Sequence, residues 1–192
     1  MFLGISIGLW VVIGVVLIVV LWFIGTYNRF VRLRNRVDEA WSDIDVQLKR
    51  RANLIPNVIE TVKGYAKHEE GVFTKVTDAR TRVMDAEKKG DVKGTAQAEN
   101  MLSGALKTLF AVSENYPDLK ANANFLDLQR ELADTENKIQ ASRRFYNTNV
   151  KELNVKIDSV PSNVVASMIG VKKREYFEVE EEGERKPTKV SF

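Results

Sequence analysis

The sequence predicts an all-α protein in which an N-terminal transmembrane helix continues into an antiparallel, four-helix-type bundle of long helices. Three observations lead to this fold class. An uncharged apolar run opens the chain, a cluster of arginines follows it closely, and apolar residues recur every three or four positions through most of the remaining residues. The last pattern is typical of helices with one buried face.

The apolar run covers residues 2–24, and its only polar side chain is Ser6. A helix needs about 20 apolar residues to cross a bilayer core of roughly 30 Å, so this run is long enough. A cleaved signal peptide would begin with a positive segment and have a shorter apolar stretch. A buried helix of a soluble protein would rarely be apolar on every face. We therefore expect a transmembrane anchor over residues 1–26.

The charges that flank the anchor predict its orientation. Arg29, Arg32, Arg34 and Arg36 follow the run, whereas no Lys or Arg precedes it. Basic residues near the end of a span tend to stay in the cytoplasm. The N-terminus should therefore lie outside, and everything after the anchor should lie in the cytoplasm.

Composition limits the partners that this chain can have. The 192 residues include no cysteine, so disulfides and cysteine-linked lipid anchors are excluded. The net charge is only +3, and basic residues are interleaved with acidic ones, which argues against a nucleic-acid partner. The expected partners are the lipid bilayer, a protein whose identity cannot be inferred, and further copies of the chain. Gly4 and Gly8 have the spacing that permits close packing of two membrane helices, although such short matches also arise by chance.

Residues 27–170 are predicted to form the helical bundle domain. Its first helix continues from the anchor without a clear breaker until Pro56, which lacks the N–H that would bond to the carbonyl of Ala52. Two interpretations follow: Pro56 kinks one long helix, which we favour, or Asn53 caps a new helix that begins there. The expected buried face consists of Phe30, Leu33, Val37, Trp41, Ile44, Leu48, Ala52, Ile55, Ile59 and Val62.

Three further stripes predict three further helices. One ends at the loop-like residues 88–91, and the next stops before Tyr116 and Pro117. In the longest, Thr135, Ser142 and Asn149 occupy alternate seam positions, where polar groups can set helix register; alternatively, the buried face shifts to include Phe145 and Val150. The stripes are Val72, Val76, Ala79, Val83, Ala86; then Ala98, Leu102, Ala105, Leu109, Val112; then Phe125, Leu128, Leu132, Thr135, Ile139, Ser142, Tyr146, Asn149, Leu153, Ile157.

After a short apolar turn at residues 164–169, the chain becomes strongly charged. Residues 171–192 contain few apolar side chains, so we expect a charged, mobile C-terminal tail.

No catalytic, cofactor-binding or metal-ligating residue is predicted, and no cofactor is expected. His68 is the only histidine, and the chain has no cysteine to join it as a metal ligand. The glycine-rich nucleotide motifs and the nucleophile elbow of hydrolases are absent from the sequence. These observations favour a protein that is not an enzyme.

The order of residues in the bundle resembles the bacterial LemA family over nearly the whole chain before the tail. Small departures occur at Val160 and Val171, where the family often has Phe. The segments that carry the resemblance are Tyr27-Asn28-Arg29-Phe30-Val31, Arg34-Asn35-Arg36-Val37, residues 39–51, Leu54-Ile55-Pro56-Asn57, residues 116–121, Asn124-Phe125, residues 128–132, residues 135–139 and Arg143-Arg144-Phe145-Tyr146-Asn147.

This resemblance implies a single-pass protein of the bacterial inner membrane, with an antiparallel bundle of long helices and no established enzyme activity. Some relatives participate in magnetosome membrane formation, which gives a membrane-organising role a precedent. We therefore expect a non-enzymatic, membrane-anchored interaction or scaffold protein. The alternative is a regulatory accessory subunit of a membrane enzyme such as a protease.

The predicted orientation can be tested with one introduced cysteine, because the natural chain has none. Lys89→Cys, in the expected loop, should resist an impermeant thiol reagent in intact cells and react after lysis. Labelling in cells whose outer membrane alone has been opened would place the bundle on the opposite side.

Overall fold

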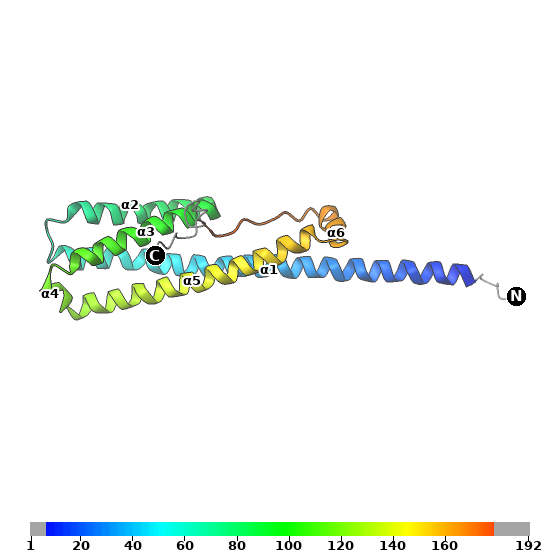
Figure 1. The fold of residues 1–192 in the computed structure, drawn as a ribbon, viewed down its shortest axis with the longest axis horizontal. Coiled ribbons are helices and arrows are strands. Elements are labelled where there is room, and N and C mark those ends of the chain that lie inside the picture. Colours follow the sequence, from blue (N-terminus) through cyan, green and yellow to red (C-terminus); the bar gives the residue numbers. More distant parts are fainter. Residues whose placement is uncertain (1–6, 179–192) are drawn as a thin grey trace, which may run out of the picture.

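The computed structural model describes residues 7–178, and these residues form helices and connecting segments without a strand, which confirms the all-α prediction (Figure 1). The helices are α1 (Ile7–Lys63), α2 (Glu70–Lys89), α3 (Val92–Ser113), α4 (Pro117–Lys120), α5 (Ala123–Asp158) and α6 (Ser162–Met168).

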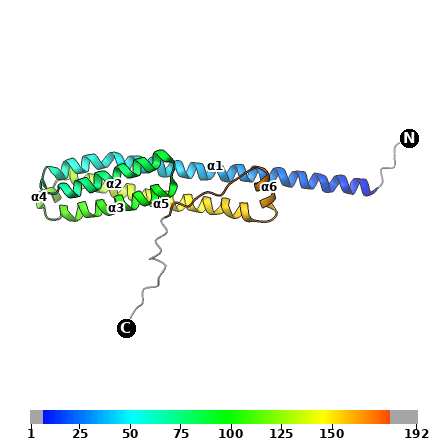
Figure 2. The ribbon, with the colours of Figure 1, turned by 90° about the horizontal axis from the view of Figure 1, so that it is seen from above.

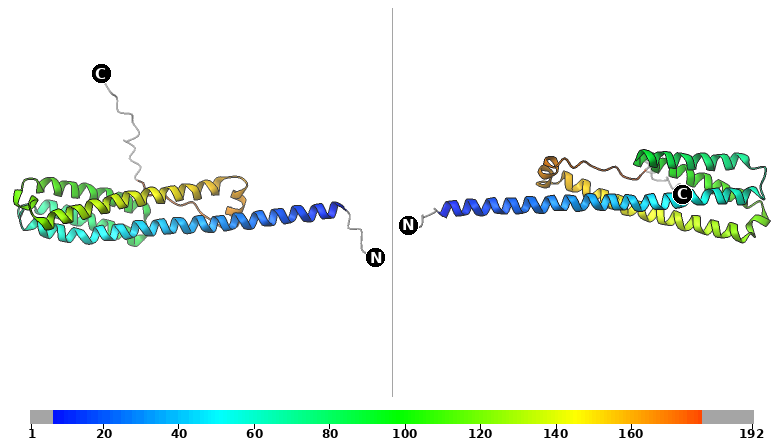
Figure 3. Two further views of the ribbon diagram at one scale, coloured as in Figure 1. Left: turned by 90° about the horizontal axis from the view of Figure 1, so that it is seen from below. Right: turned by 180° about the vertical axis from the view of Figure 1, so that it is seen from behind.

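The long helices α1 and α5 run antiparallel, and α2 and α3 form a hairpin beside them (Figures 1 and 2). The hairpin covers only the part of α1 farthest from the N-terminus. The bundle therefore has two halves. The distal half contains α1, α2, α3 and α5, whereas the proximal half contains α1, α5 and the short α6 (Figure 3).

Helix α1 continues through Pro56, so the expectation of a continuous helix is confirmed over a fresh start at Asn53. Proline leaves the carbonyl of Ala52 without its usual donor. In the structure, the Arg80 Nε of α2 donates a hydrogen bond of 2.7 Å to this carbonyl oxygen. A side chain of the neighbouring helix thus replaces the bond that the proline removes.

The buried faces largely follow the predicted stripes, with small shifts. On α1, Ala40 and Val58 are fully buried, whereas Trp41 and Ile59 are only half-buried. On α5, both interpretations of the seam are partly correct, because Thr135, Asn149 and Val150 are buried. Phe145, however, is 52% exposed and does not join the core.

Two separate apolar clusters make up the core. The distal cluster includes Ile55 of α1, Val76 of α2, Leu102 of α3 and Phe125 of α5. The proximal cluster joins α1 and α5 to α6 and includes Phe30, Tyr146 and Val165. The two clusters follow one another along the bundle axis, because α1 contributes residues from 30–48 to the proximal one and from 55–62 to the distal one.

The helix ends agree with ordinary capping chemistry. Gly90 closes the α2–α3 turn with φ of 65°, in the left-handed region that glycine adopts without strain. Asp91 accepts a hydrogen bond from the Gly94 N–H at the start of α3, and Asn122 caps α5 in the same way through Phe125. These caps fix where the hairpin turns and where α5 begins.

The prediction of a mobile tail from residue 171 is wrong for its first eight residues. Residues 171–178, here named the strap, run in extended conformation back along α5, and Phe177 is 0% exposed. The low apolar content of this segment was misleading because backbone hydrogen bonds and a single aromatic side chain hold it. The rest of the expected tail, residues 179–192, lies outside the described residues.

Within the described residues, α1 is the one helix long and apolar enough to cross a membrane. None of its most hydrophobic window is buried inside the protein. The apolar side chains of this N-terminal window, including Leu17, Ile18 and Leu21, are exposed. A helix that is apolar all round and buries nothing against protein is suited to lipid.

The bond between Arg80 and Ala52 makes a testable prediction about α1. Arg80→Met should lower the free energy of unfolding by about 1–2 kcal/mol, because it leaves a buried carbonyl without a donor. In a Pro56→Ala background the backbone N–H at position 56 can bond to Ala52, so the same change should cost clearly less. Chemical denaturation of the four proteins measures this difference, with exposed Arg82→Met as the control. An equal loss in both backgrounds would show that Arg80 does not compensate for the proline.

Candidate functional site

The strap is held on α5 by two asparagines that bind its backbone. The side-chain amide of Asn147 accepts from the Phe177 N–H at 2.8 Å and donates to the Phe177 carbonyl at 3.3 Å. Asn154 does the same with Arg174, at 3.0 and 2.9 Å. Two helical turns and three extended residues both span about 10 Å, so the two pairs are in register.

An aromatic pocket holds the end of the strap. Phe177 lies with its ring centroid 5.9 Å from that of Trp41, and the Arg143 guanidinium carbon lies 5.3 Å from the Phe177 centroid. Tyr146 packs on Trp41 and donates its hydroxyl to the Glu175 carbonyl at 3.0 Å. Burial raises the pKa of Tyr146 to about 12, so the hydroxyl remains a donor at neutral pH.

The strap lies against α1 and α5 as an extended peptide, at a site here named the strap groove. A side-chain amide that bonds to both the N–H and the carbonyl of one residue recognises backbone, whatever the residue type. The aromatic pocket and the 2.8 Å ion pair between Arg174 and Asp38 add side-chain selectivity. This site was not predicted from the sequence, although Asn147 and Asn154 are one heptad apart on the same helix face.

A buried ionic layer separates the two apolar clusters. Arg51 Nη1 of α1 lies 2.7 Å from carboxylate oxygens of both Glu99 on α3 and Glu136 on α5. Its Nη2 donates to the Ser103 hydroxyl at 3.0 Å, and that hydroxyl donates to Glu136. Arg51 and Glu99 are almost completely buried. The burial of Arg51 was not predicted from the sequence.

Burial and neighbouring charges shift the pKa of Glu99 in opposite directions. Burial raises the pKa of Glu99, while the Arg51 guanidinium opposes that rise and Glu136 adds to it. Two carboxylates share one guanidinium, and one Glu99 oxygen and the Arg51 Nε have no hydrogen-bond partner among the described residues. Breaking a buried ion pair typically costs about 3–5 kcal/mol, because it leaves an uncompensated charge inside. The layer therefore ties α1, α3 and α5 together in one register.

A second titratable group lies where α2 faces α1. Burial raises the pKa of Glu87 to about 7; the nearby Asp45 carboxylate also raises it, whereas Lys49 lowers it. These three residues line a surface hollow together with Ala52, Asn53, Met84 and Lys88. Glu87 is thus a carboxyl group that changes charge near neutral pH.

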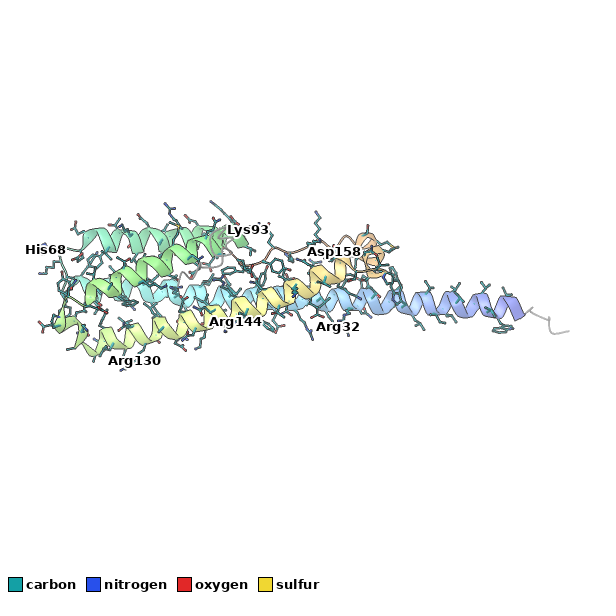
Figure 4. The ribbon with its side chains drawn as sticks, in the orientation of Figure 1. Arg32, His68, Lys93, Arg130, Arg144 and Asp158 are labelled. Carbon is teal, nitrogen blue, oxygen red and sulfur yellow. The ribbon has the colours of Figure 1, made fainter. Side chains whose placement is uncertain are left out.

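His68, which the sequence marked as chemically isolated, lies in the α1–α2 turn at the distal tip (Figure 4). Its side chain is exposed. Among residues 7–178, no group of three or more metal-binding side chains comes together. The features that stand out are the strap groove and the ionic layer, and both bind protein groups to one another.

The fold and these features define a membrane-associated helical bundle with an apolar N-terminal helix. The model of the LemA family matches residues 40–192. This match covers most of the sequence, so the chain belongs to the LemA family.

Curated relatives agree with this assignment. The chain is 27% identical over 181 residues to magnetosome protein MamQ 1 and to magnetosome protein MamQ 2 of Paramagnetospirillum magneticum, covering 82% of this chain and 66% of each relative. It is 30% identical over 149 residues to protein LemA of Metamycoplasma hominis, covering 77% of this chain and 66% of the relative. The chain thus spans slightly less than two thirds of the length of these relatives.

The raised pKa of Glu87 predicts a dependence of stability on pH. Between pH values of about 4.5 and 7, the unfolded state loses its proton before the folded state does, so stability falls as pH rises through this window. Glu87→Gln removes this contribution. The melting temperature of the variant should therefore rise relative to that of the wild type as the pH increases. The exposed Glu70→Gln is the control. A constant difference from pH 4.5 to 8 would contradict the raised pKa.

Proposed function

We propose that this chain is a non-enzymatic scaffold anchored in the bacterial inner membrane, with its N-terminus outside and its bundle in the cytoplasm. The observation that carries the proposal is the continuity of α1 from Ile7 to Lys63. One uninterrupted helix joins the apolar segment to both core clusters, so the bundle is held rigidly at the membrane. A stiff support of this kind presents helix faces in a defined direction.

Orientation follows from the basic flank of α1. Arg29, Arg32, Arg34 and Arg36 lie within four helical turns of the end of the apolar run. Basic residues in this position favour the cytoplasmic side. Arg29 also forms a 3.1 Å ion pair with Glu152 of α5, and Arg34 lies 4.0 Å from Asp38, so the flank is part of the folded bundle.

Self-association is the activity that this architecture supports best. Anchoring confines copies to two dimensions and raises their effective concentration, so weak contacts between bundles are strengthened. The MamQ relatives are by name magnetosome proteins. For this chain we infer a role in organising the membrane that anchors it.

The alternative function, a regulatory accessory subunit of a membrane enzyme such as a protease, is favoured by the strap groove. Binding of an extended backbone is a recurring mode of peptide recognition. Affinity capture from gently solubilised membranes separates the two functions. A scaffold should recover mostly its own copies, whereas an accessory subunit should recover a protease.

The scaffold predicts that the full-length protein oligomerises in nanodiscs and in detergent, while a fragment from Asn28 onward stays monomeric at micromolar concentration. Gly8 lies on α1 and Gly4 lies outside the described residues. Gly4→Leu with Gly8→Leu should reduce assembly if the anchors touch, because bulky side chains hold the backbones apart. Gly14→Leu, on another face of the helix, is the control. A full-length protein that is monomeric in both media would favour the accessory subunit.

A further inference from the structure

Helix α6 has one buried face and one exposed apolar face. Ser162, Val165 and Ala166 are buried against the bundle. On the opposite side, Val164 is 58% exposed and Met168 is 70% exposed. These two residues are four apart, so they share one face of the helix. Val160, in the turn just before α6, is 81% exposed and extends the same apolar surface.

This surface lies at the end of the bundle from which the apolar segment of α1 emerges (Figures 1 and 3). Helix α6 contacts α1 directly. Phe23 of α1 packs against the same core cluster that contains Val165 and Ala166 of α6. Phe23 is the last residue but one of the apolar run 2–24. The level of α6 along α1 is therefore the level at which α1 leaves the hydrocarbon core.

Basic side chains surround this end of the bundle. Arg29, Arg32 and Lys172 are exposed, and Arg34, Lys172 and Lys173 line a hollow whose wall includes Ile169 at the end of α6. Three carboxylates offset part of this charge, since Arg29 pairs with Glu152, Lys173 with Asp158 and Arg174 with Asp38. The remaining positive charge complements an anionic lipid surface.

We propose that α6 is a second membrane contact, in which Val160, Val164 and Met168 enter the boundary between headgroups and acyl chains beside α1. The partner is the lipid bilayer itself, on the side where the bundle lies. This inference rests on the proposed anchoring of α1. Interfacial helices bury such an apolar face at this depth and place basic residues along the headgroups. With two contacts, the bundle cannot swivel freely about the axis of α1.

Depth-dependent quenching of the full-length protein tests this proposal. Single-cysteine variants carry a bimane label, and the protein is reconstituted in phosphatidylcholine–phosphatidylglycerol nanodiscs that contain lipids with a shallow doxyl quencher. Met168→Cys reports on α6, and Leu17→Cys reports on the anchor. Met101→Cys is the matched control, because Met101 is also exposed but lies on α3.

The label at position 168 should lose at least half of its fluorescence, whereas the label at position 101 should lose none. Val160→Asp with Val164→Asp in the Met168→Cys protein should abolish the quenching without lowering the melting temperature, because both side chains are exposed.

Three results would overturn the inference. If the label at position 17 is quenched and that at 168 is not, the anchoring stands and the contact of α6 fails. If neither is quenched, the anchoring fails as well. If the accessibility of the label at 168 falls only when each nanodisc holds more copies of the protein, the exposed face of α6 binds a second copy and not lipid.

Discussion

The hydrogen-bond ladder of α1 is the constraint on which the rest of the structure depends. This helix contacts α2, α5 and α6, and it supplies residues to both core clusters. A break at Pro56 would separate the distal half of the bundle from the membrane segment. The Arg80 bond to the Ala52 carbonyl meets the one backbone acceptor that the proline leaves unpaired. A single side chain from α2 thus helps to preserve a helix of 57 residues.

The unequal lengths of the helices explain why an extended segment is part of the fold. The α2–α3 hairpin turns at Gly90 and covers only the distal half, so the faces of α1 and α5 stay open in the proximal half. The strap covers part of this surface, placing Phe177 against Trp41 and Tyr146. Two asparagines satisfy its backbone in place of a neighbouring strand. The ionic layer of Arg51 marks the boundary between the halves.

The fold could be predicted from the sequence because it follows from local patterns. The apolar run, the spacing of the stripes and the turn residues each indicate helices within a few residues of their position. The small errors on α1 have the same origin: Ala40 and Trp41 are neighbours on the helix, and spacing alone cannot decide which one faces the core. The smaller Ala40 is buried, and Trp41 lies at the edge of the core, where Phe177 packs against it.

The candidate sites could not be predicted because they depend on contacts between distant residues. Arg51, Glu99 and Glu136 carry ordinary helix-surface charges in the sequence, and only the packing of three helices brings them together. Asn147 and Asn154 have the spacing of a ladder, but its partners begin 20 residues farther along, in a segment whose composition suggested disorder. Composition indicates how much apolar surface a segment can bury. It does not indicate whether another helix provides hydrogen-bond partners for the backbone of that segment.

The length of α1 also determines how far the distal tip lies from the membrane-spanning segment. From the end of the apolar run to the turn that carries His68, the helix extends by about 60 Å at its normal rise per residue. The distal tip is therefore displaced from the anchor by more than the width of a typical small domain. A molecule captured at the tip and a molecule captured beside α6 would occupy separate layers of space. One continuous helix thus fixes the separation between these two ends of the bundle.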